Sequence, residues 1–426
     1  MSQYTSLSKP ELERLKDALQ ASYQEQKELG LTLNMARGKP CKEQLDLSMD
    51  MLNLLNGTSD LVLSTGDDCR NYGILEGIPE IRRLFADLMD ADPADVIVSG
   101  NSSLTLMFDM IASAMSDGID GGKPWSQQGK LKFLCPVPGY DRHFSITEYY
   151  DMEMILVPMT STGPDMDLVE RLVESDPQIK GIWCVPKYSN PQGITYSDET
   201  VRRMAALKPA APDFRVFWDN AYCVHELTTE PDQLLSIFAA CKEAGNEDLV
   251  VQFTSTSKIT FAGAGVAAMA GSEKTLKNFR RRLAFKTIGP DKINQLRHLW
   301  FLKDVDGIKR HMEKHRKIMA PRFEVVLRFL EQELKEPGVA SWTNPKGGYF
   351  VSVDVMEGCA KRVVALCKEA GVTLTGAGAT YPKGVDPKDS NIRIAPSFPP
   401  LEELEAAMKV FCISAKLAAV EKLLEA

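Results

Sequence analysis

Long apolar segments are missing from this chain of 426 residues. No uninterrupted apolar run approaches the about 20 residues that a membrane-spanning helix needs. The N-terminal residues also lack the apolar core of a secretory signal. A net charge of −8 leaves no basic excess for a general nucleic-acid surface. We therefore expect no membrane and no nucleic acid among the partners of this protein.

Paired cysteines are missing as well. The nine cysteines are scattered, form no Cys-x-x-Cys motif and are odd in number. Buried reduced thiols explain this pattern better than disulfides or a zinc site. His311 and His315 have the spacing of metal ligands on a helix, but their charged neighbours and the lack of a third ligand favour a solvated helix face. We expect a cytoplasmic protein without a metal site.

The chain contains instead a series of short apolar runs separated by helical patterns. Near-continuous apolar strands that alternate with helices predict an α/β fold with a mostly parallel sheet covered on both faces. Seven strands are expected, over residues 96–98, 132–135, 154–157, 181–185, 215–218, 249–253 and 265–270. Ligands of such sheets gather at the carboxyl ends of the strands.

The length of the chain favours two domains. We expect residues 61–305 to form a large ligand-binding domain, and residues 306–426 to form a smaller α+β domain. A charged amphipathic pattern over 307–335 predicts a long helix that links them. The first 30 residues predict a helix that Gly30 ends, and we assign residues 1–60 to the smaller domain.

A lysine closes the hydroxyl-rich segment that directly follows one predicted strand. After residues 249–253 come Thr254-Ser255-Thr256-Ser257-Lys258. Lysine is rarely buried without a partner, and burial lowers its pKa toward the neutral amine that attacks a carbonyl. The hydroxyls beside it can donate hydrogen bonds to a phosphate. A solvated surface turn is the alternative, but the pattern suits the Schiff base and phosphate site of pyridoxal phosphate (PLP).

A carboxylate ends another predicted strand. Asp219 follows residues 215–218 and precedes Tyr222 by three positions. A buried carboxylate must be paired, and the protonated ring nitrogen of PLP is a suitable partner. Tyr222 could reach the phenolic oxygen of the same ring. The alternative for Asp219 is a helix cap.

Polar residues follow three further strands. Ser102 and Ser103 open a helix whose N-terminus suits an anion, although an ordinary N-cap gives the same pattern. Tyr140 could stack on a planar ring or belong to the core. Asn190 precedes a proline that holds it out of the helical region, so its amide could point into a cleft; a plain turn is the alternative.

Taken together, these residues resemble the fold type I PLP-dependent enzymes, and specifically the class I aminotransferases, over nearly the whole chain. The matching positions are Tyr72 in a Tyr-Gly-x-x-x-Gly segment, Asn101, Ser102 and Ser103 in the phosphate loop, Tyr140, Asn190, Asp219, Tyr222, Ser255, Ser257 and Lys258 in a Ser-x-Ser-Lys motif, and Arg393 in an Asn-x-Arg motif. Seven motifs in family order, each after an expected element, make a chance match improbable.

The resemblance implies a role for each position. Lys258 would hold PLP and shuttle a proton between the substrate Cα and the cofactor C4′. Asp219 would support the ring charge, Tyr222 and Asn190 would tune the ring oxygen, and Tyr140 would stack on the ring. In the substrate pocket, which Gly38 would line, Arg393 would clamp the α-carboxylate. Tyr72 would touch the cofactor phosphate of a neighbouring subunit, which implies a homodimer with shared active sites.

One position departs from the family. An arginine usually follows the lysine in a Gly-x-Arg-x-Gly segment and neutralises the phosphate, whereas residues 263–267 contain no cation. The chain is in this respect similar to a divergent bacterial aspartate aminotransferase subgroup, which also resembles the aminotransferase domains of some transcriptional regulators.

The resemblance implies transamination, with L-aspartate and 2-oxoglutarate giving oxaloacetate and L-glutamate. A dicarboxylic substrate needs a second cation, and Lys286, Lys292 and Arg297 are the candidates. One alternative is another PLP enzyme, an aminotransferase, lyase or decarboxylase for a different amino acid. A regulator that only senses PLP is disfavoured, because it needs a DNA-binding module of roughly 60 residues and only about 30 helical residues precede the 37–40 loop.

Overall fold

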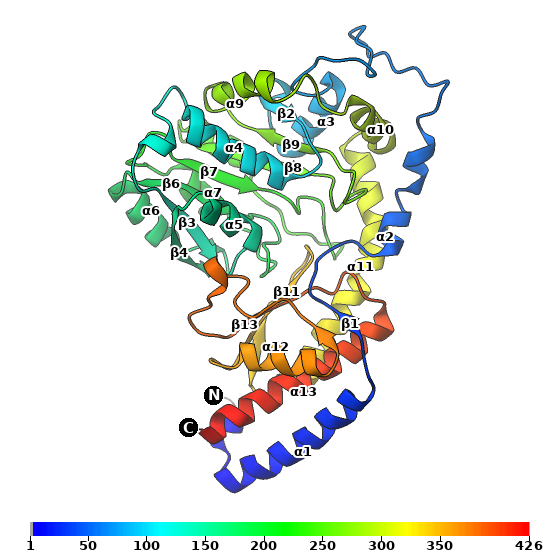
Figure 1. Ribbon diagram of the computed structural model, residues 1–426, viewed down its shortest axis with the longest axis vertical. Coiled ribbons are helices and arrows are strands. Elements are labelled where there is room, and N and C mark those ends of the chain that lie inside the picture. Colours follow the sequence, from blue (N-terminus) through cyan, green and yellow to red (C-terminus); the bar gives the residue numbers. More distant parts are fainter. Residues whose placement is uncertain (1–2, 426) are drawn as a thin grey trace.

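The computed structural model describes residues 3–425. Figure 1 shows a larger part built around a twisted sheet and a smaller part that contains both ends of the described chain, joined by one long helix. None of the helices in residues 3–425 combines the length and apolar character needed to cross a membrane.

The large sheet is mostly parallel, as predicted. Its eight strands lie in the order β2-β9-β8-β7-β6-β3-β4-β5. The strands are β2 (Val96–Val98), β3 (Lys132–Val137), β4 (Glu153–Thr160), β5 (Gly163–Pro164), β6 (Ile179–Cys184), β7 (Arg215–Asp219), β8 (Val250–Ser255) and β9 (Ala267–Ala270). Strands β4, β3, β6, β7 and β8 run parallel to one another, and β9 runs antiparallel between β8 and β2. The seven predicted strands are all present, and β5 is an added two-residue edge strand.

Helices cover both faces of this sheet because successive strand residues point to opposite faces. Phe217 belongs to one buried cluster, together with residues of α4 and α9. Its neighbours Val216 and Trp218 belong to a second cluster, together with residues of α6, α7 and α8. These helices are α4 (Ser103–Asp117), α6 (Met166–Ser175), α7 (Asp198–Ala205), α8 (Ile237–Glu243) and α9 (Glu273–Lys286). Burial on both faces explains why the strands read as continuous apolar runs.

The linking helix α11 (Val305–Leu334) takes part in two cores, and its bounds lie close to the predicted 307–335. Ile308 and Met312 pack with the large part, in a cluster that includes α3 (Pro79–Met89) and α10 (Lys292–Leu302). Further along, Phe323 and Leu330 pack in the core of the smaller part. The helix therefore connects the two parts through buried contacts.

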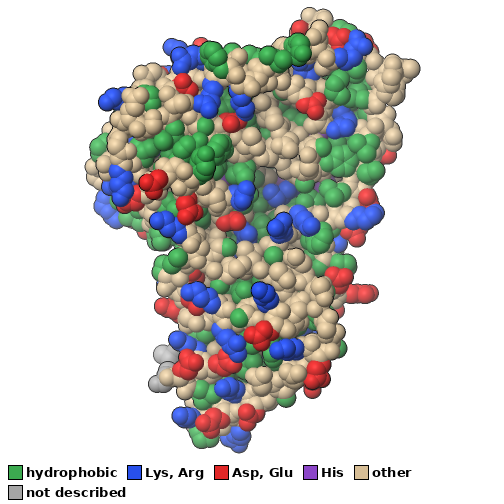
Figure 2. Space-filling model, viewed as in Figure 1, with side chains coloured by type: hydrophobic (Ala, Val, Ile, Leu, Met, Phe, Trp, Pro, Cys, Tyr) green, Lys and Arg blue, Asp and Glu red, His purple; other side chains and the backbone are tan. Residues whose placement is uncertain are grey.

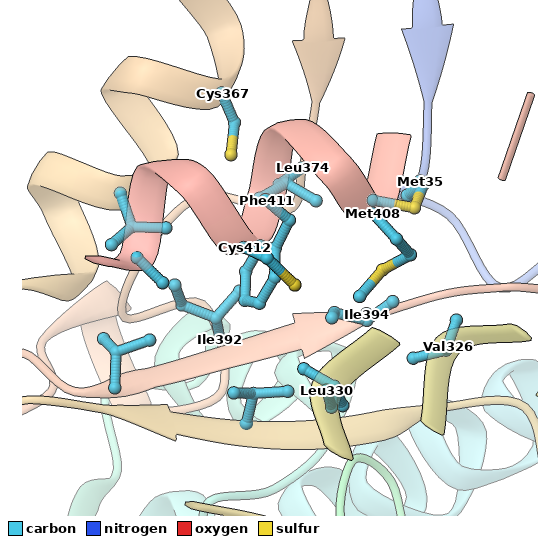
Figure 3. Close-up of a cluster of buried hydrophobic side chains, with 14 of the residues drawn as sticks. Met35, Val326, Leu330, Cys367, Leu374, Ile392, Ile394, Met408, Phe411 and Cys412 are labelled. Atoms are coloured by element: carbon cyan, nitrogen blue, oxygen red, sulfur yellow. The ribbon is translucent and has the colours of Figure 1, made fainter. Parts of the chain in front are cut away.

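The smaller part contains a three-stranded antiparallel sheet and a two-stranded parallel pair. Figure 3 shows Ile392 and Ile394 between Phe411 and Met408 on one side and Leu330 on the other. The elements are α1 (Lys9–Glu28), β1 (Leu33–Asn34), β10 (Ala340–Trp342), β11 (Val351–Val355), α12 (Ala360–Glu369), β12 (Val372–Thr373), β13 (Asn391–Ile394) and α13 (Leu401–Glu425). The bounds of the two domains, with 1–60 in the smaller one, stay our interpretation.

The remaining helices are short connections. They are α2 (Lys42–Asp46), α5 (Asp141–Tyr149), η1 (Gln3–Ser6), η2 (Met49–Asn53), η3 (Pro93–Asp95), η4 (Trp125–Gln127), η5 (Glu247–Leu249) and η6 (Pro382–Gly384).

The prediction that His311 and His315 lie on a solvated helix face is wrong. Both side chains are buried on α11, where the N-terminal segment around α2 packs against that helix. All five histidines of the chain are in fact buried. Residues 3–425 contain no group of three or more His, Cys, Asp or Glu side chains placed to hold an ion.

Candidate active site

A cavity of ≈ 200 Å³ lies at the carboxyl ends of the central strands. It is lined by Ser102, Ser103, Leu104, Tyr140, Val185, Asn190, Asp219, Ala221, Tyr222, Ser255, Ser257 and Lys258. Nine of these residues are predicted site residues, and they come from segments more than 150 positions apart. The molecular face in Figure 2 is hollowed between the two parts of the molecule, and Lys and Arg side chains gather around the hollow.

Asp219, the last residue of β7, is buried at this cavity. Its Oδ2 accepts a 2.9 Å hydrogen bond from Nε2 of His143, whose ring stacks on Trp183 at 4.7 Å between centroids. Its Oδ1 is buried and has no partner in the described chain. A buried carboxylate oxygen without a donor is costly, so Asp219 is prepared for a ligand with an N–H group.

Lys258 lies three residues beyond Ser255, the last residue of β8. Its Nζ is 5.1 Å from the ring centre of Tyr222 and 5.7 Å from that of Tyr349. Burial lowers the pKa of Lys258, the charge of Asp219 opposes that shift, and the charge of Arg393 adds to it. The lowered pKa makes the neutral amine, which nucleophilic chemistry requires, easier to reach.

Two tyrosines that line the same cavity are protonated phenols rather than phenolates. Burial raises the pKa of Tyr140 to about 12, and it raises the pKa of Tyr222 well above its ordinary value, with nearby Tyr140 and Asp219 adding to the effect. Both phenols therefore keep their protons near neutral pH and can donate them in hydrogen bonds.

Hydroxyl groups and a helix N-terminus form one wall of the cavity, the hydroxyl wall. Ser102 caps α4, its Oγ accepting from the N–H of Thr105, and Ser103 begins that helix. Ser255 Oγ donates to Ser257 Oγ at 3.0 Å, and Ser257 Oγ donates to the carbonyl of Asn101 at 3.2 Å. Asn101 thus joins the wall through its backbone.

Such a wall suits an anion, because free N–H groups and hydroxyls converge on it. Lys258 is the single cation among the residues that line the cavity. A Cβ on Gly265 would lie 3.1 Å from the Asn101 carbonyl oxygen and 3.3 Å from the Ser257 nitrogen, so a side chain there would crowd the wall. The segment that lacks the family's arginine is thus packed tightly against the hydroxyl wall.

Arg393, on β13 of the smaller part, reaches the site through Asn190. Its Nη1 donates to Asn190 Oδ1 at 3.2 Å and to Asp141 Oδ1 at 3.0 Å. The guanidinium lies over the ring of Phe350, with Cζ 4.7 Å from the ring centre. Its Nε is buried and has no partner in residues 3–425. Arg393 therefore has one unfilled edge that can bind a carboxylate.

Gly38 packs against Phe350. A Cβ at this position would lie 2.3 Å from Cζ of Phe350, so any side chain would displace the ring that supports Arg393. Gly38 acts in this structure through close packing, since its own φ is not in the left-handed region.

A buried histidine cluster, which the sequence did not reveal, lies behind Lys258. His225 Nε2 is 3.3 Å from the carbonyl oxygen of Lys258, and its ring is edge-on to Tyr222 and Tyr349. Gln44 Nε2 contacts Nδ1 of His315 at 3.1 Å and donates to the hydroxyl of Tyr349 at 2.9 Å. Burial, followed by the charge of Lys258, lowers the pKa of His225 to about 3.

Four predicted residues lie away from the cavity. Tyr72 is 77% exposed, and the Gly73 beside it donates its N–H to the carbonyl of Ile288. Lys286 pairs with Asp109, Lys292 is buried with Nζ 3.0 Å from the Gly73 carbonyl oxygen, and Arg297 donates to Asn294 Oδ1 at 2.5 Å.

Helix α5 supplies residues that sequence reasoning missed. Tyr140 caps it, Asp141 begins it and His143 lies in its first turn. One turn of helix therefore holds a ring of the cavity, a partner of Arg393 and a partner of Asp219. The sequence signal that could have identified these residues was the position of Asp141 and His143 directly after the predicted site residue Tyr140.

The residues present fit PLP. The unpartnered Oδ1 of Asp219 can accept from a protonated ring nitrogen, the hydroxyl wall can hold a phosphate, and Lys258 can form the covalent link. When bound, PLP supplies an electron sink for the carbanion that forms as an amino acid loses its Cα proton.

Comparisons with known proteins point to the aminotransferases. A family model described as aspartate amino-transferase matches residues 7–426. An aspartate aminotransferase of Corynebacterium glutamicum is 48% identical over 95% of this chain and 93% of its own length. A crystal structure of an aspartate transaminase from Corynebacterium glutamicum superposes with a TM-score of 0.96 at 46% identity, covering 99% of both chains.

The relation to transcriptional regulators is distant. An uncharacterized HTH-type regulator of Bacillus subtilis is 24% identical over 66% of this chain and 55% of its own length.

Proposed function

The chain belongs to the aspartate aminotransferase family, and from that premise we propose that it transfers the amino group of L-aspartate to 2-oxoglutarate with PLP as cofactor. The products are oxaloacetate and L-glutamate. One observation carries this proposal: a single cavity joins Lys258, Asp219 and, through Asn190, the carboxylate-binding Arg393.

Lys258 is the residue that moves the proton. Its lowered pKa makes the neutral amine available, first to hold the cofactor and then, once released, to take a proton from the substrate Cα. With PLP bound, the same amine would return that proton at C4′. Asp219 would stabilise a protonated ring nitrogen, and Tyr222 and Asn190 would hydrogen-bond the ring oxygen.

Arg393 positions the amino acid. Its free edge binds the α-carboxylate. Phe350 below the guanidinium and Asn190 beside it hold the guanidinium plane in place. This fixed geometry directs the Cα proton toward Lys258.

A second cation for the distal carboxylate comes from the 286–297 region in this proposal. Lys292 is buried against the carbonyl of Gly73 and anchors the neighbouring loop. Lys286 and Arg297 keep part of their surface accessible, so they are the stronger candidates to reach a substrate in a partner subunit.

The working form is proposed to be a homodimer with shared sites. Tyr72, Phe285 and Ile288 are 77%, 87% and 61% exposed, and the N–H of Gly73 donates to the carbonyl of Ile288, just beyond α9. Large apolar side chains gathered on one surface favour burial against a second protein. A second copy of the chain that covers them would place Tyr72 next to the partner's phosphate wall.

The proposed place of work is the cytoplasm. All nine cysteines fall within residues 3–425, and none of them is in a disulfide. Eight of the nine are buried, a state that a reducing compartment preserves.

A panel of amino donors tests the proposed reaction. Purified enzyme loaded with PLP is assayed with 2-oxoglutarate and aspartate, an aromatic or an aliphatic amino acid. Losing the contact to a distal carboxylate costs about 1.5–3 kcal/mol, so aspartate should exceed the other donors about tenfold or more in kcat/KM.

An aromatic or aliphatic donor that exceeded aspartate tenfold would refute the substrate and leave amino transfer standing. Release of pyruvate or ammonia without an oxo acid would instead indicate a lyase.

A further inference from the structure

Arg393 already has a carboxylate partner before any substrate arrives. Asp141 Oδ1 lies 3.0 Å from Nη1 of Arg393, and this is the one ion pair of Arg393 among the described residues. The Arg393 side chain is 8% exposed and that of Asp141 is 37% exposed. A negative charge therefore lies directly beside the group that binds the substrate's own negative charge.

The two carboxylates need not compete for the same nitrogen. Nη1 is taken by Asp141 and Asn190, whereas the buried Nε has no partner in residues 3–425. A guanidinium presents two forked edges, and a carboxylate binds side-on across Nε and Nη2. The incoming α-carboxylate thus finds an edge that is free, on a cation that is already partly neutralised.

The fold holds Asp141 in this place. It is the first residue of α5, where an acidic side chain also interacts favourably with the helix dipole. His143, two positions along the same turn, donates to Asp219. Near the start of the helix, the Gly139 N–H donates to the carbonyl of Thr380, whose Oγ1 donates to Asn391 Oδ1 at the start of β13. Asp141 and Arg393 are therefore fixed relative to each other.

We propose that Asp141 is a positioning residue that weakens carboxylate binding by Arg393. It holds the Arg393 guanidinium at Nη1 and cancels part of the guanidinium charge, so that substrates and products dissociate readily. The inference rests on the proposed function, because it assigns Arg393 to the substrate α-carboxylate. A carboxylate contact is present in substrate, transition state and product alike, so its strength affects KM and release more than the chemical step.

The substitution Asp141→Asn separates charge from position. Asparagine has the same shape, and its Oδ1 can still accept from Nη1 of Arg393, but the negative charge is gone. Removing a like charge near the bound carboxylate should tighten binding about tenfold. We expect the Kd of succinate for the PLP-loaded enzyme, measured by calorimetry, to fall about tenfold, and the KM of amino donor and oxo acid to fall similarly without a rise in kcat.

Two further variants complete the test. Glu148→Gln removes one exposed charge from the same helix, at a residue with no ion pair in residues 3–425, and should leave the Kd of succinate unchanged. Asp141→Ala removes charge and acceptor together, and should tighten binding less than Asp141→Asn because Nη1 loses a tether.

An Asp141→Asn enzyme that bound succinate as the parent does, or more weakly, would overturn the proposal. That result differs from failure of the proposed function, in which the parent enzyme itself would neither bind succinate nor transfer an amino group.

Discussion

His143 donates from Nε2 to Oδ2 of Asp219 at 2.9 Å, and both side chains are buried beneath the cavity. This bond fixes the carboxylate and leaves Oδ1, which has no partner in the described chain, to face the cavity. The arrangement holds the Asp219 carboxylate in one orientation. Its Oδ1 faces the place where the proposed ring nitrogen binds.

Asp219→Asn should therefore damage catalysis more than folding. The amide keeps the shape but no longer stabilises a positive ring nitrogen, and a charge-assisted hydrogen bond of about 1.5–3 kcal/mol is lost. We expect kcat/KM to fall about tenfold to a hundredfold in steady-state assays. His143→Ala should have a smaller effect, because Oδ1 and its charge remain.

A buried carboxylate elsewhere provides the control for this prediction. Asp213 pairs with Lys180 at 2.7 Å and does not line the cavity. Asp213→Asn should lower the melting temperature while the kcat of the folded enzyme stays at the parent value. Equal loss of kcat in both variants would contradict a specific role for Asp219.

Acid should destabilise this protein below about pH 6.5. Burial lowers the pKa of His225 and His315 to about 3 and that of His298 to about 4, from an ordinary value of 6.5. The unfolded chain then binds protons that the folded chain excludes, so the free energy of unfolding falls as the pH drops through 6.5 and continues to fall toward pH 4. Each such histidine contributes a slope of about 1.4 kcal/mol per pH unit.

Urea unfolding at about pH 7 and about pH 5 measures this slope. His298→Gln removes one of the side chains that bind a proton only in the unfolded chain. The loss of stability between the two pH values should therefore shrink by about 1–2 kcal/mol. A parent protein equally stable at both pH values would show that the histidines titrate normally.

A homodimer should depend on the exposed apolar residues Tyr72, Phe285 and Ile288. Phe285→Asp places a charge where the proposed partner buries an aromatic ring, so we expect a monomer in light scattering and weaker retention of PLP. Val385→Asp, at a residue 63% exposed on the smaller part, is the matched control and should leave the mass unchanged. Equal masses for parent, Phe285→Asp and Val385→Asp would argue against this interface.

The fold and most of the cavity could be predicted because their signals are local. Continuous apolar runs identify the buried strands, and the strand-end rule then places Asp219, Lys258 and Ser102 at one edge. Asp219 directly follows one such run, and Lys258 comes four hydroxyl residues after another.

The partners of these residues could not be predicted, because they depend on tertiary packing. Asp141 and Arg393 are 252 positions apart, and Gly38 meets Phe350 from the opposite end of the chain. His311 and His315 read as a charged surface because their neighbours in sequence are charged. Their burial follows from Ser48 and Gln44 of the N-terminal segment, which contact their rings.

The most direct measurement is amino transfer from aspartate to 2-oxoglutarate by the parent enzyme and by Lys258→Ala, both incubated with PLP. The account predicts that the parent enzyme shows the visible absorbance shift of lysine-bound PLP and transfers the amino group. Without the amine that holds the cofactor and moves the proton, Lys258→Ala should lose the absorbance shift, and kcat should fall by at least about a thousandfold. Transamination at the parent rate in Lys258→Ala would contradict the account.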